Sequence, residues 1–368
     1  MIFQPASRAF ESLVGRVQVR GVPVPLVPSN GQEYSSAVLP AVRSWAGSDK
    51  LVVVFGQVDM ALPVPGASSI GIQHGIYWDL DPDKPQVPWD LLRDTPKQPQ
   101  TTVVRRIAAG LLRRTLLGRW RTEARAYRRL VGYAKGYDAV DVRVCVDHNF
   151  PNWYRTVSRG GSAKPEYVII NPAEIATPEQ LAARKADSEL VRIIFARRFF
   201  WYRGTGIMAV AGKRLLATHP NVRITLAGEG PDSAAMREYF TGESRIQFVC
   251  YRPEESLQTH LAHDVAVNAS LGSEGSSLSV GEGMGAGCAV VATDVGGVTN
   301  MILDGYNGLL VNPNAEALYE GLQRVVSDAE LRARLGRRAW ETAGTAFSLD
   351  QWKQQWREVI IRAAAVED

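Results

Sequence analysis

Cysteine and histidine are scarce in this sequence, and none of them lies in a pattern that binds a metal. The three cysteines, Cys145, Cys250 and Cys288, are far apart, so they form neither zinc-site spacing nor a disulfide framework. His260 and His263 are three residues apart, but no third type of ligand lies close to them. We therefore expect no bound metal, and a compartment that keeps thiols reduced.

Long apolar runs are also absent. No stretch reaches the roughly 18 apolar residues of a membrane-spanning helix, and the N-terminus lacks the basic and then apolar segments of a signal peptide. The fractions of 45% hydrophobic and 22% charged residues are typical of a globular protein. A length of 368 residues favours two domains, and we expect a cytoplasmic location.

The basic charge is concentrated in one segment. Between positions 101 and 138, ten basic residues stand against two acidic ones, a net +8, whereas the whole chain carries +4. Apolar and aromatic residues lie between the arginines, a pattern that favours peripheral binding to an anionic membrane surface. The same charge would attract phosphates of a lipid-linked acceptor, and a solvated helix packed on its own domain is the alternative. We expect no nucleic-acid partner, because no recognition module accompanies the segment.

Apolar runs alternate with helical periods from about residue 190 onward. This alternation predicts a parallel sheet with helices on both faces, whose ligands bind at the carboxyl ends of the strands. Strands are expected at 191–196, 222–228, 246–250, 264–270 and 289–293, and helices at 206–219, 233–240 and 254–262. Further strands are expected at 50–56, 67–74 and 140–147, and an amphipathic helix at 349–365.

Two glutamates lie eight positions apart in a run of small residues, SEGSSLSVGEGMGAG (273–287). The run follows an expected strand and enters a helix, so small side chains leave the amides of a helix N-terminus open to an anion. A carboxylate accepts paired hydrogen bonds from neighbouring hydroxyls, so Glu274 and Glu282 each suit a sugar diol. The alternative is a glycine-rich turn with two solvated glutamates.

The segment EGSSLSVGEGMGAGCAVVATDVGG (274–297) resembles the retaining glycosyltransferases of the GT-4 type, in which seven residues separate two glutamates. Gly283 stands where the family usually has alanine. The resemblance extends through ITLAGEGPD (224–232) and ILDGYNGLLVNPNAEALYEGLQRVVSDAELRARLGRRA (302–339), and covers roughly 190–350. It implies the GT-B fold, an α/β architecture of two Rossmann-like domains that face each other across a cleft.

The resemblance also implies a division of the chain. Residues 1–165 would form an acceptor-side Rossmann-like domain and residues 166–348 a nucleotide-sugar-binding one. Residues 349–368 would form a C-terminal helix that packs back on the first domain. The family's glycine-pair loop near the N-terminus is missing here, so the first domain is expected to be shortened.

Individual roles follow from the family's motifs. In ARRFFWYRGTG (196–206), Arg198 and Arg203 match the two cations with which the family binds the donor diphosphate. Arg203 stands where the family usually has lysine. Arg197 replaces Arg198 if the register differs by one, and surface arginines are the alternative. Glu274 would orient the sugar, Glu282 the ribose, and His74 would lie near the reaction centre unless it is structural. The remaining donor-binding candidates are Gly228, Tyr251, Arg252, Gly275, Ser276, Ser277 and Leu278, with Tyr251 and Arg252 against the base or in an ordinary turn.

The function implied is transfer of a sugar, with retention, from a nucleotide diphosphate sugar to a glycan or lipid-linked acceptor. We expect a metal-independent enzyme without a cofactor, of the hexosyltransferase type, in bacterial surface polysaccharide assembly. The nucleotide, the sugar and the acceptor stay open. The alternatives are a sugar-nucleotide epimerase or hydrolase of the same fold, a non-catalytic subunit that binds nucleotide sugars, and a protein that binds polyanions through residues 101–138.

Overall fold

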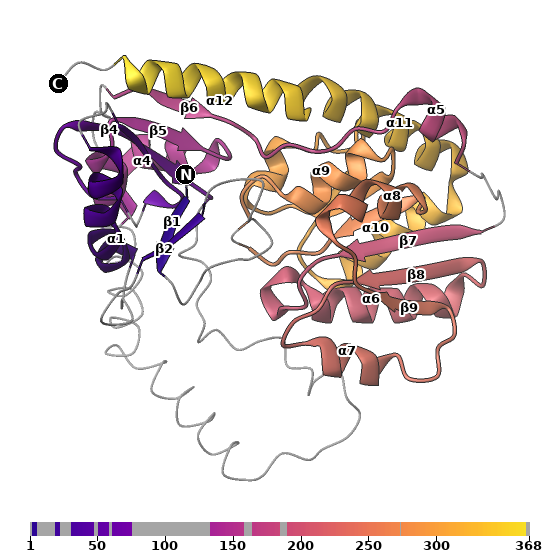
Figure 1. The fold of residues 1–368 in the computed structure, drawn as a ribbon. Helices are drawn as coiled ribbons and strands as arrows, with labels where there is room; N and C mark the ends of the chain where they lie inside the picture. The colour runs from indigo at the N-terminus through magenta and orange to yellow at the C-terminus, as the bar shows by residue number, and fades with distance from the viewer. Residues whose placement is uncertain are drawn as a thin grey trace, which may run out of the picture.

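The protein is described by a computed structural model in which two parallel sheets lie side by side (Figure 1). The structure describes residues 2–5, 19–22, 31–47, 51–58, 61–75, 133–157, 164–184, 190–272 and 274–365. Of the basic segment 101–138, only the last six residues fall within these ranges, so its predicted membrane-surface role lies outside the described residues. Among the helices described, none has the length and apolarity needed to cross a membrane.

The larger sheet occupies the C-terminal half and has six parallel strands in the order β12-β11-β10-β7-β8-β9. Side chains alternate between its faces: Ile193 and Phe195 pack with α6 and α10, and Ile194 packs with α9 and α11. The predicted doubly covered parallel sheet is thereby confirmed. The strands are β7 (Val191–Ala196), β8 (Val222–Ala227), β9 (Ile246–Val249), β10 (Val265–Asn268), β11 (Ala289–Thr293) and β12 (Leu309–Val311).

Helices and short 3-10 turns connect these strands. Asn314 and Asp328 begin two of the helices by accepting a backbone N–H with their side chains, which satisfies free amides of the first turn. The elements are α5 (Pro178–Ala182), η5 (Trp201–Arg203), α6 (Thr205–Thr218), α7 (Ser233–Tyr239), η6 (Pro253–Glu255), α8 (Ser256–Leu261), α9 (Leu278–Gly285), η7 (Gly296–Asn300), α10 (Ala315–Ser327) and α11 (Ala329–Ala346).

The smaller sheet lies in the N-terminal half and has four parallel strands in the order β3-β4-β5-β6. Its last strand, β6, pairs with β5, so this sheet continues past residue 165. The described elements are β3 (Leu51–Phe55), β4 (Ala67–Gln73), β5 (Val142–Cys145), β6 (Glu166–Val168), α1 (Gly31–Ala46) and α4 (Asn149–Val157). A separate parallel pair is formed by β1 (Ile2–Pro5) and β2 (Val19–Val22).

The C-terminal helix α12 (Leu349–Ala364) runs from the larger sheet back to the smaller one (Figure 1). Its Val359 and Ala363 are fully buried against Ile70 and Val142 of the N-terminal sheet. Burying apolar side chains stabilises a fold by about 25 cal/mol per Å², so α12 ties the end of the chain to the first domain.

Loops at the carboxyl ends of both sheets meet in a seam between the domains. The His148 N–H donates to Asn300 Oδ1 (2.9 Å), and Asn171 donates through its N–H and Nδ2 to Ser276 Oγ (3.0 Å) and O (2.8 Å). Asp147 Oδ2 is buried in this region without a hydrogen-bond partner in the part of the chain that is described. Residues 274–278, which we call the donor loop because the sequence predicts that they bind the donor, are therefore held by Asn171 from the segment that follows β6.

Candidate functional site

Glu274 is the centre of a buried polar cluster at the carboxyl end of the larger sheet. Its side chain is 7% exposed, and its Oε2 accepts hydrogen bonds from Arg197 Nη2 (2.6 Å), Ser270 Oγ (2.6 Å) and Arg203 Nη1. One carboxylate oxygen thus meets two guanidinium groups and a hydroxyl. The loop between β10 and α9 places it there.

The charge of Glu274 is set by opposing effects. Burial raises the pKa of its carboxyl, but Arg197 and Arg203, together with the Ser270 hydroxyl, lower the pKa below the ordinary value of 4.5. A buried carboxylate next to two guanidinium groups stays ionised at neutral pH. The site therefore holds a fixed negative charge between two positive ones.

Arg197 holds the donor loop through hydrogen bonds to side chains within it and next to it. Its Nη1 donates to Ser277 Oγ and Ser279 Oγ, both at 2.9 Å, and its Nη2 also reaches Ser270 Oγ at 3.1 Å. Burial lowers the pKa of this guanidinium, whereas Glu274 opposes the change, and an arginine stays protonated under such conditions. A planar fork of donors suits this arrangement better than a single ammonium would.

Arg198 is not part of this cluster. It is exposed, its guanidinium lies 5.0 Å from the centre of the Phe200 ring, and it has no ion pair among the described residues. Both arginines lie just past the end of β7, where the chain buries Arg197 against Glu274 and leaves Arg198 exposed. The structure brings Arg203 and Arg197 to Glu274, and not Arg198.

The N-terminus of α9 lacks a side-chain cap. Ser277 occupies the N-cap position, but its hydroxyl accepts from Asn268 Nδ2 (2.8 Å) and Arg197 instead of from the first turn of the helix. The following Leu278 is 57% exposed. Uncapped amides and the helix dipole form a site for an anion, and here they lie next to Glu274.

Two of the predicted glycines permit close backbone contacts. A Cβ on Gly275 would lie 2.7 Å from the His74 carbonyl oxygen and 2.8 Å from Val146 Cγ2. A Cβ on Gly228, whose φ is +143°, would lie 2.0 Å from the Arg197 carbonyl oxygen. Both contacts are too short for any side chain, so glycine is required at each position.

Glu282 lies on α9 and is half-buried. Burial raises the pKa of Tyr251 to about 12, and the charge of Glu282 adds to this shift. The Glu282 charge also acts on His260, whose Nε2 is buried without a partner among the described residues. The charge of Glu282 therefore reaches both Tyr251 and His260. Arg252 is instead exposed and pairs with Glu255 at 2.8 Å.

His74 lies at the seam between the domains. Its Nε2 donates to the Gly56 carbonyl at 2.7 Å, and since a carbonyl can only accept, the ring carries its proton on Nε2 when it is neutral. The backbone of His74, not its ring, contacts the donor loop. The imidazole has no direct bond to Glu274 in this state.

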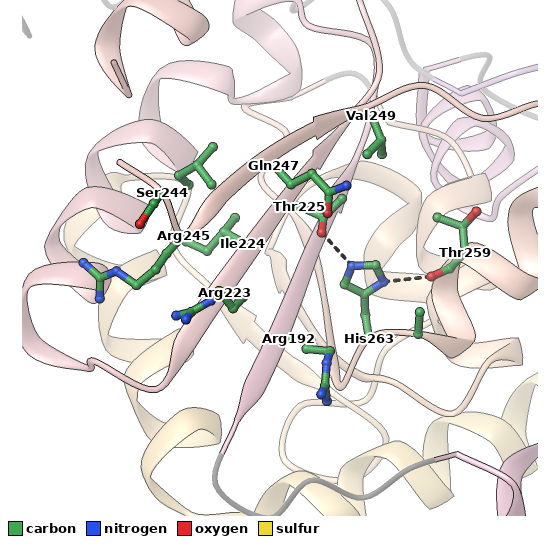
Figure 2. Close-up of a pocket in the computed structure, with 12 residues that line it drawn as sticks. Arg192, Arg223, Ile224, Thr225, Ser244, Arg245, Gln247, Val249, Thr259 and His263 are labelled. Carbon is green, nitrogen blue, oxygen red and sulfur yellow. Dashed lines mark hydrogen bonds between the residues drawn. The ribbon is translucent and has the colours of Figure 1, made fainter. Parts of the chain in front are cut away.

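A cavity of about 570 Å³ lies on the C-terminal domain, away from the Glu274 cluster (Figure 2). Its lining includes Arg192, Arg223 and Arg245 near the amino ends of the strands, and His263, which Figure 2 shows hydrogen-bonded between Thr225 and Thr259. It contains none of the predicted site residues. In the described ranges, no group of three or more histidine, cysteine or acidic side chains is placed to hold a metal.

Several residues of the cluster were not among the predicted site residues. Asn268 is the last residue of the buried strand β10 and Ser270 lies two residues beyond it, and Thr293 Oγ1 donates to the Ser270 carbonyl at 2.6 Å. Polar residues at the carboxyl end of a parallel strand are a signal for a ligand site, and NAS (268–270) carries it. Asn171 gives no comparable signal, because its contact with Ser276 spans 105 positions of sequence.

Comparisons with known proteins relate the C-terminal half of the chain to glycosyltransferases. Residues 191–328 match the family model described as Glycosyl transferases group 1. The phosphatidylinositol N-acetylglucosaminyltransferase gpi3 subunit of Schizosaccharomyces pombe is 25% identical over 189 residues, 50% of this chain and 41% of that protein. An exopolysaccharide phosphotransferase of Streptomyces coelicolor is 27% identical over 234 residues, 62% of this chain and 24% of that protein.

Solved structures show the same fold over nearly the whole chain. HepE of Anabaena, in complex with UDP and glucose, superposes with a TM-score of 0.64 at 18% identity, covering 96% of this chain and 89% of that one. The chain spans less than half the length of the two curated relatives above. Residues 191–328 are thus similar to the group 1 glycosyltransferases, and the chain has the GT-B fold of two domains, each built on a parallel sheet.

Proposed function

We propose that this protein transfers a sugar from a nucleotide diphosphate sugar to an acceptor hydroxyl. The observation that carries the proposal is the uncapped N-terminus of α9, which lies beside the buried cluster of Glu274, Arg197 and Arg203. Amides that no side chain caps, next to an arginine and a carboxylate, suit a ligand that joins a diphosphate to a polyol.

The diphosphate would bind the donor loop. The amides of residues 275–278 and the dipole of α9 attract its oxygens, and Arg203, whose side chain is 27% exposed, can turn from Glu274 toward it. Bond cleavage leaves negative charge on the β-phosphate, and donors placed in advance stabilise that charge most effectively. Arg197 would stay in place, because it is bonded to Glu274 and Ser277 within the loop and to Ser270 and Ser279 on either side of it.

The two acids would hold the two sugars of the donor. Glu274 Oε1 has no hydrogen-bond partner in the described part of the chain, so it can accept from hydroxyls of the transferred sugar. Glu282 on α9 is half-buried, so its carboxylate can accept from the ribose hydroxyls. This assignment gives each of the predicted acids its own part of the donor.

We further propose retention of configuration without a metal. The bond from the anomeric carbon to the phosphate oxygen breaks, the acceptor oxygen bonds to the same face of that carbon, and the departing phosphate takes the acceptor proton. A glycan or lipid-linked acceptor in bacterial surface polysaccharide assembly is supported by the similarity to the exopolysaccharide phosphotransferase, over 62% of this chain.

Thermal denaturation with added nucleotides tests this proposal. UDP, GDP, ADP, TDP and CDP are added separately to the protein and to its Glu282→Ala variant. A ligand at a hundred times its Kd stabilises the folded state by about 2.7 kcal/mol, so one diphosphate should raise the Tm and the variant should lose that rise. No rise with any of the five would contradict the proposal.

Product analysis separates transfer from its alternatives. A transferase forms a new glycoside and needs an acceptor, whereas a hydrolase or epimerase of this fold would convert the sugar nucleotide without one. A non-catalytic binding subunit would show the Tm rise without any product.

A further inference from the structure

Four consecutive aromatic residues, FFWY (199–202), follow β7 at the edge of the donor site. Phe199 is fully buried in the core, whereas Phe200, Trp201 and Tyr202 are half-buried. The ring centres of Phe200 and Tyr202 are 5.2 Å apart, and those of Trp201 and Tyr202 are 5.8 Å apart. These three aromatic rings therefore form one patch that stays partly exposed outside the hydrophobic core.

An arginine lies at each end of this patch. Arg198 lies 5.0 Å from the Phe200 ring centre, and Arg203 lies 5.2 Å from that of Tyr202 while it also donates to Glu274. Cations prefer the face of an aromatic ring within about 6 Å of its centre. We call these five residues, 198 and 200–203, the aromatic ladder: contacts lead from Arg198 through Phe200 and Tyr202 to Arg203 and Glu274, and Trp201 packs on Tyr202.

The backbone holds the ladder firmly against the donor site. The Leu271 N–H donates to the Tyr202 carbonyl at 2.9 Å, in the loop that leads to Glu274. Gly204 follows at a φ of +78°, where a Cβ would lie 1.6 Å from the Ala269 carbonyl oxygen. The loop is therefore packed backbone to backbone, and its rings form a preformed surface.

The positive charge of Arg198 suggests that the ladder binds an anion other than the donor diphosphate. Arg203 is already shared with Glu274 and with the proposed diphosphate. Arg198 is exposed, has no ion pair among the described residues, and takes no part in the cluster around Glu274. Aromatic side chains with a few polar groups typically line sites for small organic ligands, and a guanidinium binds carboxylates, sulfates and phosphates in paired hydrogen bonds.

We propose that the aromatic ladder is the acceptor subsite and that it selects an acidic oligosaccharide. The apolar face of a sugar ring would lie on Trp201, Tyr202 or Phe200, and Arg198 would bind its acidic substituent. This places the acceptor next to Glu274, where the transferred sugar is proposed to bind. The inference rests on the proposed function and adds to it the chemical class of the acceptor.

The test uses an array of oligosaccharides that carry uronic acid, sulfate or phosphate groups, printed beside neutral ones. The full-length protein is applied with the nucleotide diphosphate found in the thermal experiment, and the affinity for that nucleotide is measured on the same sample. We expect retention on acidic members, at least a tenfold loss with Arg198→Gln or Trp201→Leu, and nucleotide affinity within about twofold of the parent protein. Arg237→Gln is the matched control, because Arg237 on α7 lies 4.6 Å from the Phe248 ring outside the ladder and should change nothing.

Three results would overturn the inference. They are equal retention on neutral and acidic members, no retention while the nucleotide still binds, and a loss of nucleotide affinity in Arg198→Gln. The third would show that Arg198 grips the donor. Failure of the nucleotide to bind the parent protein would instead reject the proposed function, so the two failures are distinguishable.

Discussion

Adjacent arginines with opposite environments allow a direct test of the site. Arg197 is 9% exposed and makes four hydrogen bonds, to Ser270, Glu274, Ser277 and Ser279, whereas Arg198 is exposed. Methionine has a similar length and no charge. Arg197→Met would therefore remove the donors from a buried carboxylate and from three hydroxyls, and Arg198→Met removes only a surface charge.

The expected loss can be estimated from these contacts. Removing one partner of a buried ion pair costs about 3–5 kcal/mol, but Arg203 and Ser270 still compensate Glu274, so we take the lower end, about 3 kcal/mol. Surface substitutions stay within about 0.5 kcal/mol. Arg197→Lys keeps the charge but not the fork, so we expect an intermediate loss of about 2 kcal/mol from two missing bonds of about 1 kcal/mol each.

Urea denaturation followed by tryptophan fluorescence measures these differences. At an m-value near 2 kcal/mol per molar, Arg197→Met should lower the midpoint by about 1.5 M, and Arg198→Met by less than about 0.3 M. Equal midpoints for the two methionine variants would refute the assignment of Arg197 as the buried organiser of the donor loop.

Three further predictions concern turnover, pH and backbone packing. Glu274→Gln should lower turnover by at least about 10²-fold, the scale of a lost transition-state contact, in a product assay with each variant's fold checked by circular dichroism; undiminished turnover would remove Glu274 from the reaction. Burial lowers the pKa of His263 below its ordinary value of 6.5, so the neutral ring contributes stability above pH 6.5 that is lost as the pH falls toward the folded-state pKa. In denaturation at a series of pH values, the free energy of unfolding of the parent protein should therefore fall more steeply below pH 6.5 than that of the His263→Gln variant. Identical curves would contradict this. Gly275→Ala should weaken nucleotide binding at least tenfold in calorimetry, because its Cβ would lie 2.7 Å from the His74 carbonyl oxygen. Gly56→Ala is the control and should bind like the parent protein, because a Cβ there meets open space. Equal nucleotide affinities of the two variants would mean that the seam tolerates a side chain at position 275.

Local sequence features were enough to predict the architecture of the larger domain. Each strand from β7 to β11 is a short apolar run bounded by polar residues, and this pattern depends only on neighbouring positions. The position of Glu274 before a helix could also be predicted, because small residues precede α9 and a strand precedes them. These parts of the site depend on contacts within about ten residues.

The role of each cation could not be predicted in the same way. Arg197 and Glu274 are 77 positions apart, and nothing local distinguishes Arg197 from its neighbour. Tyr251 and Arg252 pose the same problem, since Tyr251 is half-buried against the core and Arg252 pairs with Glu255 at the surface. The burial of a side chain depends on the element that packs over it.

By itself, the sequence determined the order of strands and helices, the loop of small residues and the two acids that flank the start of α9. Only the tertiary structure decided which arginine meets Glu274, how the Ser277 hydroxyl is used, and which aromatic rings stay outside the core. The physical reason is range: periodicity and turn chemistry act between neighbours, whereas ion pairing and burial depend on segments that folding brings together from distant positions.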